Sequence, residues 1–460
     1  MNLNQAGDNN QSDGDRLPWR TFSFLWVAFW FASRADLKYS IDDTRAITGL
    51  AGDRPNDSAK ALALLVLLCW ALFTLWRGRR FATNVRPFQA CLVTLYTIWS
   101  AISILWTDDL GLTLNKIGIL IVTSLMASAM AFRFSWREIV VFVFLASGLS
   151  NAIGLGAEIA LGSFHPLDGL YRFSGLWHPN THGVSLALMV LAGVALYRSE
   201  TAHRAWIAFG TTFGFTLLLL TRSRTAVGSA LFVILCTLLL TAKPAKRYLF
   251  LLGAGAAVCL ASFFIMNNVA ALPIDTLMMG RQDADNGSLT NRIPLWEDCL
   301  PYIAQHQWIG FGYGGFWTPA RIMTITAPDE VAWNPEPEKY VAEGSYLPDA
   351  HNLYIETALG TGLVGAGLLV AGLLFAILYF GVKTSRTKSQ AYSFAFSVLF
   401  WLVFEAALEA VSPQPCLPLL IYPIMLAKAA FVANEPSPMP LARSAEERPQ
   451  FTLAPEIQHA

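Results

Sequence analysis

The sequence predicts an all-α membrane protein that crosses the bilayer about twelve times. Of its 460 residues, 54% are hydrophobic and only 14% are charged, whereas charged residues make up about 25% of a typical soluble domain. Apolar runs long enough to span a hydrocarbon core of about 30 Å recur between residues 18 and 433. Polar breaks separate these runs, which is typical of a polytopic membrane protein.

The apolar pattern marks the predicted spans with different clarity. The first span is short and the last contains prolines, so one span fewer also fits the pattern. The expected spans are 18–34, 59–76, 88–106, 111–131, 138–161, 181–197, 205–221, 225–241, 248–266, 352–380, 391–410 and 416–433.

These spans divide the chain into two polar tails, two groups of spans and one long loop. Residues 1–17 are rich in Asn, Gln, Asp and Gly and predict a disordered tail. Residues 18–266 predict an N-terminal bundle of about nine spans. Residues 267–350 predict a large, partly helical loop, 351–433 the C-terminal transmembrane helices, and 434–460 a second tail.

The charges of the short loops predict the orientation of the chain. Every second short loop is basic, and the positive-inside rule assigns such loops to the cytoplasm. Both tails are then cytoplasmic, and the loop 267–350 faces the periplasm. The formal net charge is zero, which gives no argument for nucleic acid as a partner. The basic residues of these cytoplasmic short loops are Arg77, Arg79, Arg80, Arg86, Arg133, Arg137, Arg198, Arg204, Lys243, Lys246, Arg247, Lys383, Arg386 and Lys388.

One turn on the predicted outer side breaks this rule. Arg222 and Arg224 lie at an apolar boundary, where a charge is expensive unless it has an anionic partner. Snorkelling to lipid phosphates is one interpretation, and binding of a substrate anion is the other and the favoured one. Among the outer loops, 162–180 adds Arg172, which we expect to face the same anion.

Two other groups of polar residues leave alternatives open. His178 and His182 have a spacing that could hold a metal, but Pro179 and the lack of nearby carboxylates favour a loop that caps the next helix instead. Six cysteines without a CxxC pair argue against a disulfide framework or a zinc site. Glu405 and Glu409 share one helix face, which predicts either a proton pathway or structural pairing with Lys116 or another base.

Three segments of the chain resemble the O-antigen ligase/polymerase family. They are Leu289–Trp296 with an Arg-x-x-x-Trp element, Ala304–Gly314 with a glycine-rich element, and His351–Gly365 with a His-Asn element. Segments 174–180 and 223–225 also resemble motifs of this family. Glu356 departs from the small or apolar residue that is usual at its position. The aromatic and glycine content favours the exopolysaccharide polymerases over the lipid A-core ligases.

The resemblance implies a fold similar to the GT-C glycosyltransferases and an inverting, metal-independent transfer without a cofactor. The implied partners are an undecaprenyl-diphosphate-linked oligosaccharide donor, a glycan or lipid acceptor, membrane lipids and a chain-length regulator. His351 is expected to be the general base, and Arg224, Arg292 and Arg222 are expected to bind the donor diphosphate. Further candidate substrate-binding residues are Arg172, His178, Asn352, Trp296 and Tyr313.

Two alternatives to a polymerase stay open. A ligase would transfer the glycan to lipid A-core or to another acceptor. A transporter or flippase of lipid-linked glycans would require internal repeats and broken helices near the middle of the membrane. Neither feature is visible in the sequence, and the polar residues concentrate on one side, which favours an enzyme.

Overall fold

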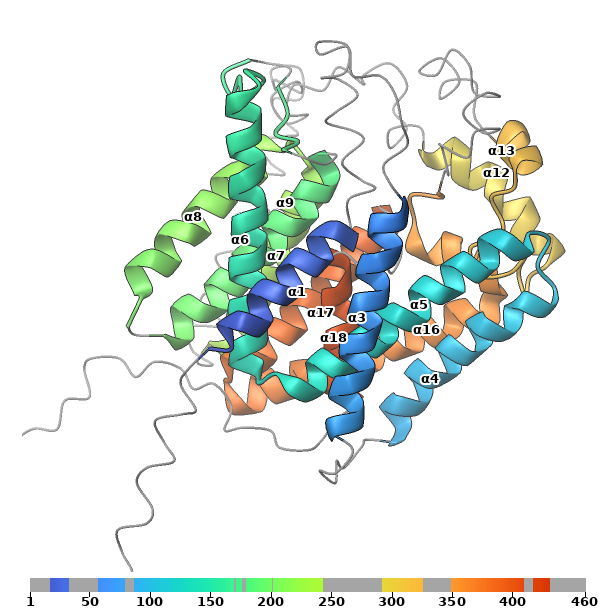
Figure 1. Ribbon diagram of the computed structural model, residues 1–460, viewed down its shortest axis with the longest axis horizontal. Coiled ribbons are helices and arrows are strands. Elements are labelled where there is room, and N and C mark those ends of the chain that lie inside the picture. Colours follow the sequence, from blue (N-terminus) through green and yellow to red (C-terminus); the bar gives the residue numbers. More distant parts are fainter. Residues whose placement is uncertain are drawn as a thin grey trace, which may run out of the picture.

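A computed structural model describes residues 17–32, 57–78, 87–168, 171–175, 179–200, 202–242, 292–325, 349–408 and 417–430 (Figure 1). Every regular element in these ranges is helical, which confirms the all-α fold class. The elements are α1 (Trp19–Ala32), α3 (Asp57–Gly78), α4 (Pro87–Ile102), a 3₁₀ turn (Ser103–Leu105), α5 (Leu110–Arg133), α6 (Trp136–Ala160), α7 (Pro179–Ser199), α8 (Arg204–Leu220), α9 (Arg224–Thr241), α12 (Arg292–Gln305), α13 (Pro319–Ile325), α16 (Leu353–Thr387), α17 (Gln390–Leu408) and α18 (Leu417–Ala430).

The described helices agree with the predicted spans. Each predicted span except 248–266, which lies outside the described residues, coincides with one of these helices. Among the described residues, 7 helices are long and apolar enough to cross a membrane: α4 with the 3₁₀ turn, α5, α6, α7, α9, α16 and α17. Segments 61–77, 204–220 and 420–430 form shorter apolar helices. A polytopic membrane protein is therefore confirmed, and the number of spans stays a prediction.

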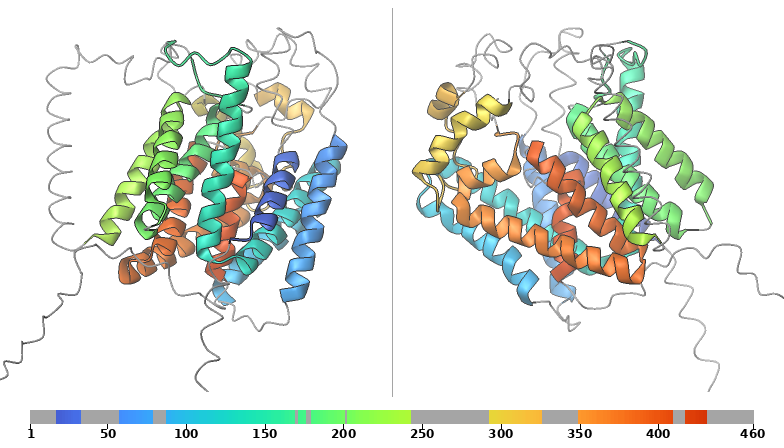
Figure 2. Two further views of the ribbon diagram at one scale, coloured as in Figure 1. Left: turned by 60° about the vertical axis from the view of Figure 1, so that its left-hand side comes forward. Right: turned by 180° about the vertical axis from the view of Figure 1, so that it is seen from behind.

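The connections between helices gather at two ends of the bundle (Figures 1 and 2). One end, called the loop face, carries the segments 106–109, 161–168, 171–175, 221–223, 306–318 and 349–352 together with α12 and α13. The opposite face carries the short connecting residues 134–135, 200, 202–203 and 388–389. The loops that the charge pattern assigns to one side thus lie together. Which compartment each face meets stays a prediction.

Helix α7 lies in the middle of the N-terminal group of helices. It packs against α6, α8, α9 and α17, and most of its residues are buried. Small residues allow this close packing, as is usual between membrane helices. At Gly183, near the start of α7, an added Cβ atom would lie 3.0 Å from the Cβ of Ser223. This contact holds the beginning of α7 against the turn that joins α8 to α9.

Helix α16 is interrupted at Gly362, whose φ of 67° and ψ of −174° are not helical. The N–H of Leu363 donates to the carbonyl of Gln307 at 2.7 Å, and the carbonyl of Leu359 accepts from the N–H of Phe311 at 2.8 Å. The segment 307–311 thus satisfies backbone groups that the break would leave open. The expectation that the helices are unbroken is wrong at this position. The break lies two to three turns from the start of α16 at the loop face.

Candidate functional site

His351 lies at the loop face, directly before α16. Its side chain is 39% exposed, and its Nδ1 atom lies 3.3 Å from Oδ1 of Asp349. The backbone N–H of His351 donates to the same carboxylate oxygen at 2.7 Å. Its φ of 45° lies in the left-handed region, which is uncommon outside glycine and costs about 1 kcal/mol or more. The chain therefore holds this histidine in a strained but accessible conformation.

Asn352 holds the start of α16 and joins it to α17. Its Oδ1 atom accepts from the N–H groups of Tyr354 at 2.9 Å and Ile355 at 3.1 Å, which is an ordinary N-cap. Its Nδ2 atom donates to the carbonyl of Ala407 at 3.0 Å. Asn352 is therefore a positioning residue for His351, because both of its polar atoms bind the protein's own backbone.

Trp296, in the second turn of α12, contacts the residue before His351. Its Nε1 atom donates to the carbonyl of Ala350 at 2.8 Å. Arg292 begins α12 four residues earlier, so it shares a helix face with Trp296. The structure thereby brings Arg292 and His351, which are 59 positions apart in the sequence numbering, to the same part of the loop face.

Glu356 links the segments on both sides of His351, a role that the sequence did not predict. Its two carboxylate oxygens accept from Nε1 of Trp317 at 3.1 and 2.9 Å, and Oε2 also accepts from the N–H of Ala350 at 3.1 Å. The departure of Glu356 from the family pattern was the only signal for it. Cys299 packs in the same cluster, and burial first, then the charges of Glu356 and Asp298, raise the pKa of its thiol to about 12. This thiol is therefore no nucleophile at neutral pH.

Tyr313 is held by its backbone and turns its hydroxyl toward other tyrosines. The N–H of Tyr313 donates to Oγ of Ser103 at 2.8 Å. Burial, then the nearby hydroxyls of Tyr96 and Tyr422 and the charge of Glu356, raise the pKa of Tyr313 well above its ordinary value. The Tyr313 side chain therefore stays neutral and can act only as a hydrogen-bonding partner.

Lys116 lies beside this tyrosine segment, not beside Glu405. An added Cβ atom at Gly314 would lie 2.5 Å from Cγ of Lys116, and the charge of Lys116 acts on Glu356. Glu405 is instead fully buried beside α9, where Oγ of Ser229 donates to its Oε2 at 3.5 Å. The suggested pairing of Lys116 with Glu405 is therefore wrong, because Lys116 contacts the loop at Gly314 whereas Glu405 contacts α9. Glu409 lies outside the described residues.

The turn that carries the other arginines is braced by Arg172. The Nε atom of Arg172 donates to the carbonyl of Thr221 at 3.0 Å, and its Nη2 atom donates to Oδ1 of Asn180 at 2.9 Å. Arg222 has a φ of 52°, and its Nη2 atom donates to the carbonyl of Asp168 at 3.1 Å. Arg224 follows as the first residue of α9. Arg172 thus positions the turn from which Arg222 and Arg224 project.

Glu158 fixes the segment that contains Arg172, and it is a second residue whose role the sequence did not assign. Its Oε1 atom accepts from the N–H groups of Ser174 at 2.8 Å and Gly175 at 2.6 Å, while Oε2 accepts from the hydroxyl of Tyr171. The carboxylate is only 4% exposed. A buried charge with this many donors is a strong local anchor. The signal in the sequence was a lone acidic residue near the end of an apolar span.

His182 belongs to the interior of the bundle. It is fully buried, its Nδ1 atom lies 2.6 Å from Oδ1 of Asn151, and its ring packs on Phe173. His178, the other histidine of the spacing that could hold a metal, lies outside the described residues. Among the residues that the structure does describe, no three His, Cys, Asp or Glu side chains are grouped so that they could hold a metal ion.

Helix α17 joins the two parts of the site. Its residue Ala407 accepts from Asn352, next to His351, and Glu405 contacts Ser229 of α9. Ser229 in turn donates to the carbonyl of Thr225 at 2.6 Å, one residue after Arg224. Asn352, next to His351, and Ser229, in the second turn of α9, therefore contact the same end of α17. Figure 2 shows both parts at the loop face.

Residues 207–370 match the family model described as O-antigen ligase. This stretch is similar to the O-antigen ligase family. This match confirms the resemblance and supports assignment to the O-antigen ligase family. The matched stretch includes Arg222, Arg224, Arg292 and His351, whereas Arg172 precedes it and α17 follows it. No curated protein matches the chain. The family supports a glycosyltransferase-like membrane protein that acts on a lipid-linked glycan and an acceptor.

Proposed function

We propose that the protein is a glycan polymerase of the bacterial inner membrane. It transfers a saccharide from an undecaprenyl-diphosphate carrier to a sugar hydroxyl of another glycan. The observation that carries this proposal is the gathering of Arg222, Arg224, Arg292 and His351 at one end of an apolar bundle, inside the stretch that matches the O-antigen ligase family. A lipid-linked donor needs such an arrangement, because its chain stays in the bilayer while its diphosphate lies at the surface.

The loop face is the periplasmic side in this proposal. The basic short connections lie at the opposite face, and the positive-inside rule assigns them to the cytoplasm. The start of α1 and the end of α18 support the same orientation, because both contact Phe134 at the opposite face. The ring of Phe22 packs on that of Phe134 with 5.6 Å between centroids. Lys428, near the end of α18, donates to the carbonyl of Phe134 at 2.7 Å.

The arginines supply fixed positive charge to the leaving group. As the acceptor oxygen forms a bond to the anomeric carbon, the bond from that carbon to the diphosphate oxygen breaks, and negative charge develops on the diphosphate. Arginine suits this task because it stays protonated and binds phosphate oxygens in a bidentate manner. Such fixed donors often contribute more to catalysis than any other feature of a site. We assign the diphosphate to Arg222, Arg224 and Arg292.

His351 takes the proton that the acceptor hydroxyl loses. Asp349 accepts from Nδ1 of the ring in this assignment, which leaves Nε2 as the basic nitrogen toward the acceptor. The same carboxylate stabilises the imidazolium that forms after the transfer. A positioned general base contributes about 10²- to 10⁴-fold to a rate. Trp296, Tyr313 and the exposed Trp308 are candidate contacts for the sugar rings.

A cavity below Tyr313 gives room for the carrier chain. Its empty space of about 660 Å³ lies between α4, α5, α16 and α18, and part of it is open to the surroundings. Tyr96 and Tyr422 line it, and both lie near the hydroxyl of Tyr313. The remaining lining is mainly apolar. We propose that part of the polyprenyl chain lies here, directly below the reacting end of the donor.

The second candidate function is ligation to lipid A-core or another acceptor, which the description of the matching family favours. One experiment tests both candidates. Purified protein in lipid vesicles is supplied with an undecaprenyl-diphosphate-linked oligosaccharide, and the products are separated by size. A ladder of lengthening glycans indicates a polymerase, and transfer that requires added lipid A-core indicates a ligase.

His351→Ala and His351→Gln are compared in the same assay with His306→Ala. His306 is an exposed histidine of the same loop, and its ring packs on Phe311 at 4.4 Å between centroids. We expect loss of at least about 10²-fold for both His351 variants and little change for the control. Full transfer by His351→Gln in properly folded protein would contradict the assignment of the base.

A further inference from the structure

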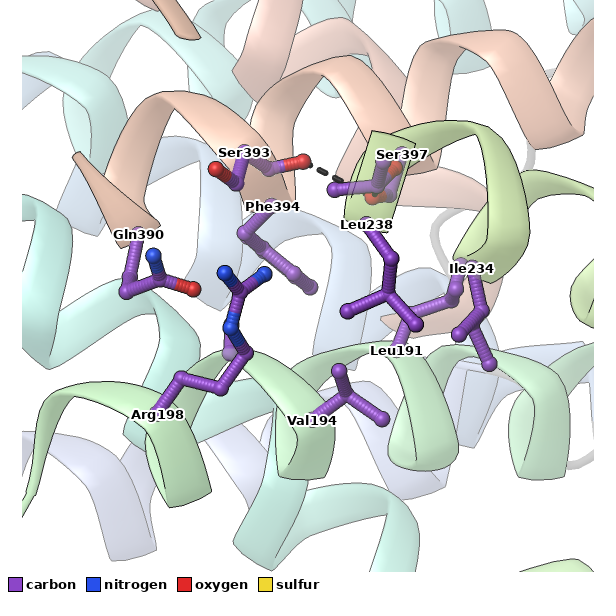
Figure 3. Close-up of a pocket in the computed structure, with 11 residues that line it drawn as sticks. Leu191, Val194, Arg198, Ile234, Leu238, Gln390, Ser393, Phe394 and Ser397 are labelled. Atoms are coloured by element: carbon purple, nitrogen blue, oxygen red, sulfur yellow. Dashed lines mark hydrogen bonds between the residues drawn. The ribbon is translucent and has the colours of Figure 1, made fainter. Parts of the chain in front are cut away.

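A second pocket lies far from the candidate site, between the opposite-face ends of α7, α9 and α17 (Figure 3). Its empty space of about 270 Å³ is mostly open to the surroundings, and only a small part is enclosed. One side of the lining is apolar and includes Leu191, Ile234 and Leu238. The other side carries Arg198 and Gln390, which lie next to each other in Figure 3. The pocket thus combines an apolar wall with a polar mouth.

Arg198 is the one charged residue among the described residues that line this pocket. It is partly buried, and within the described part of the chain its guanidinium has a single hydrogen bond, from Nη2 to Oγ1 of Thr241 at 2.9 Å. That partner is neutral, and a guanidinium has five N–H donors. A partly buried cation near the membrane is costly without an anion. Arg198 can therefore bind an anion that enters the pocket.

Arg137 at the same face has an anionic partner. Its Nε atom lies 2.6 Å from Oε1 of Glu200. Arg204, which is exposed, donates to the carbonyl of Glu200 at 2.9 Å and lies over the ring of Tyr197. Arg198 differs from both, because the described lining of its pocket contains no carboxylate. Acidic side chains are therefore present at this face, but none of them lines the described part of the pocket of Arg198.

Gln390 supplies the second, independent observation. Its side chain is fully buried, and its Nε2 atom donates to the carbonyl of Lys388 at 3.2 Å. Its Oε1 atom is buried without a hydrogen-bond partner among the described residues, and the residue lines the pocket. A buried acceptor of this kind is costly to leave unsatisfied. It needs a donor from whatever fills the pocket.

We propose that this pocket binds the head group of a glycerophospholipid. Arg198 binds the phosphate, and Gln390 accepts from an N–H or O–H donor of the same head group. Phosphatidylethanolamine and phosphatidylglycerol carry such a donor, whereas phosphatidylcholine does not. The apolar wall of Leu191, Ile234 and Leu238 contacts the glycerol and the first methylenes of the chains. The chemistry of the lining therefore selects both for a phosphate and for a donor beside it.

The position of the pocket connects it to the candidate site. The same three helices carry Asn180, Arg224 and Ala407 at their other ends, near the loop face. A lipid wedged between their opposite-face ends fixes the spacing of α7, α9 and α17. The lipid is therefore expected to stabilise the arrangement of the bundle, whichever reaction the loop face performs.

Native mass spectrometry of the full-length protein measures this directly. The protein is exchanged into detergent with phosphatidylethanolamine, phosphatidylglycerol or phosphatidylcholine, and the retained lipids are counted. Arg198→Gln is expected to weaken retention of the first two lipids by about tenfold or more, because a charge-assisted contact is lost. Arg204→Gln, an exposed arginine of the same face, is the matched control and is expected to retain lipid as the unmodified protein does.

Two more variants separate the charge from the head-group donor. Arg198→Lys keeps the charge and is expected to retain more lipid than Arg198→Gln. Gln390→Leu is expected to remove the preference for phosphatidylethanolamine over phosphatidylcholine while leaving binding to the phosphate. If Arg198→Gln does not fold, lipid retention by Arg198→Lys and by Gln390→Leu tests the proposal instead.

Three results would overturn the proposal. The first is equal lipid retention by Arg198→Gln and Arg204→Gln in folded protein. The second is equal retention of phosphatidylcholine and phosphatidylethanolamine by the unmodified protein. The third is that millimolar inorganic phosphate displaces the bound lipid and stabilises the protein against heat as much as the lipid does. That result would assign the pocket to a soluble anion.

Discussion

The carboxylate of Asp349 contacts both the backbone and the ring of His351. Its Oδ1 atom accepts the backbone N–H at 2.7 Å and lies 3.3 Å from Nδ1 of the imidazole. A single acidic side chain therefore stabilises the left-handed conformation of His351 and orients its ring. This is the pairing of base and orienting carboxylate that recurs in general-base sites.

The first prediction concerns this pair. Asp349→Asn keeps an acceptor for the backbone N–H but removes the charge that stabilises the imidazolium. We expect the turnover rate to fall by about 10- to 10²-fold, as part of the general-base contribution, with little change in thermal stability. Initial transfer rates at saturating donor measure the effect. Asp298→Asn, at an exposed carboxylate of α12, serves as a control, and equal rates for both variants would remove Asp349 from the site.

Two basic residues in left-handed backbone conformations give a matched comparison. Arg222 follows the end of α8 with a φ of 52°, and Lys388 follows the end of α16 with a φ of 56°. Glycine is preferred at such positions, so either change to glycine should relieve about 1 kcal/mol of backbone strain. We expect Arg222→Gly to keep its melting temperature and lose transfer activity, while Lys388→Gly keeps its activity.

These two variants are compared by thermal unfolding and by transfer rate with increasing donor. A rise in KM confined to Arg222→Gly is the signature of lost diphosphate binding. If both variants lose activity alike, the strain matters more than the guanidinium, and Arg222 is only structural. Lys388→Gly also loses the bond from Nζ to the carbonyl of Leu240 at 2.8 Å, so a small loss of stability is expected there.

The third prediction is a pH effect on stability through Tyr171. Burial first, then the hydrogen bond to Glu158 and its charge, raise the pKa of the Tyr171 hydroxyl above its ordinary value of 10.0. The folded state therefore keeps a proton that the unfolded state loses above about pH 10, so this contribution is present below pH 10 and is lost as the pH rises further. Tyr171→Phe should therefore make the fall of the unfolding free energy above pH 10 less steep.

Melting temperatures between pH 8 and pH 11 test this, with Tyr197→Phe as the control, since Tyr197 is an exposed tyrosine of the opposite face. If the stability of Tyr171→Phe and that of the unmodified protein fall equally steeply with pH, burial does not affect the titration of the Tyr171 hydroxyl. At pH 7, the same variant removes one donor from Glu158 and should cost about 1 to 3 kcal/mol.

The fourth prediction tests the cavity as the site of the carrier chain. Gly372 lines the cavity, and a Cβ atom added there meets nothing within 4 Å. Gly372→Leu should fill part of this space, starting from a Cβ position that is open. A loss of two buried methylenes at about 0.8 kcal/mol each would raise the KM for a long-chain donor about tenfold.

Gly367→Leu is the matched control, because Gly367 is a glycine of the same helix with equally open space around it and does not line the cavity. A short-chain donor analogue should be used by all three proteins with similar KM values. If Gly372→Leu affects the short and the long donor equally, the chain does not lie in this cavity.

The sequence determined which segments form helices and which connections lie together. Apolar periodicity is a local property, so the spans could be recognised without knowledge of their partners. The charge pattern grouped the loops correctly because each crossing of the membrane changes the side. Arg222 and Arg224 also stood out locally, since charges at an apolar boundary are rare.

Only the tertiary structure decided how these parts meet. The bond from Trp296 to Ala350 joins residues 54 positions apart, and no local pattern encodes it. Glu356 was a departure from a motif in the sequence but is a shared acceptor for Trp317 and Ala350 in the fold. The break at Gly362 is stable because segment 307–311 supplies the missing backbone partners. Such contacts depend on long-range packing, in which buried polar groups from distant segments satisfy one another.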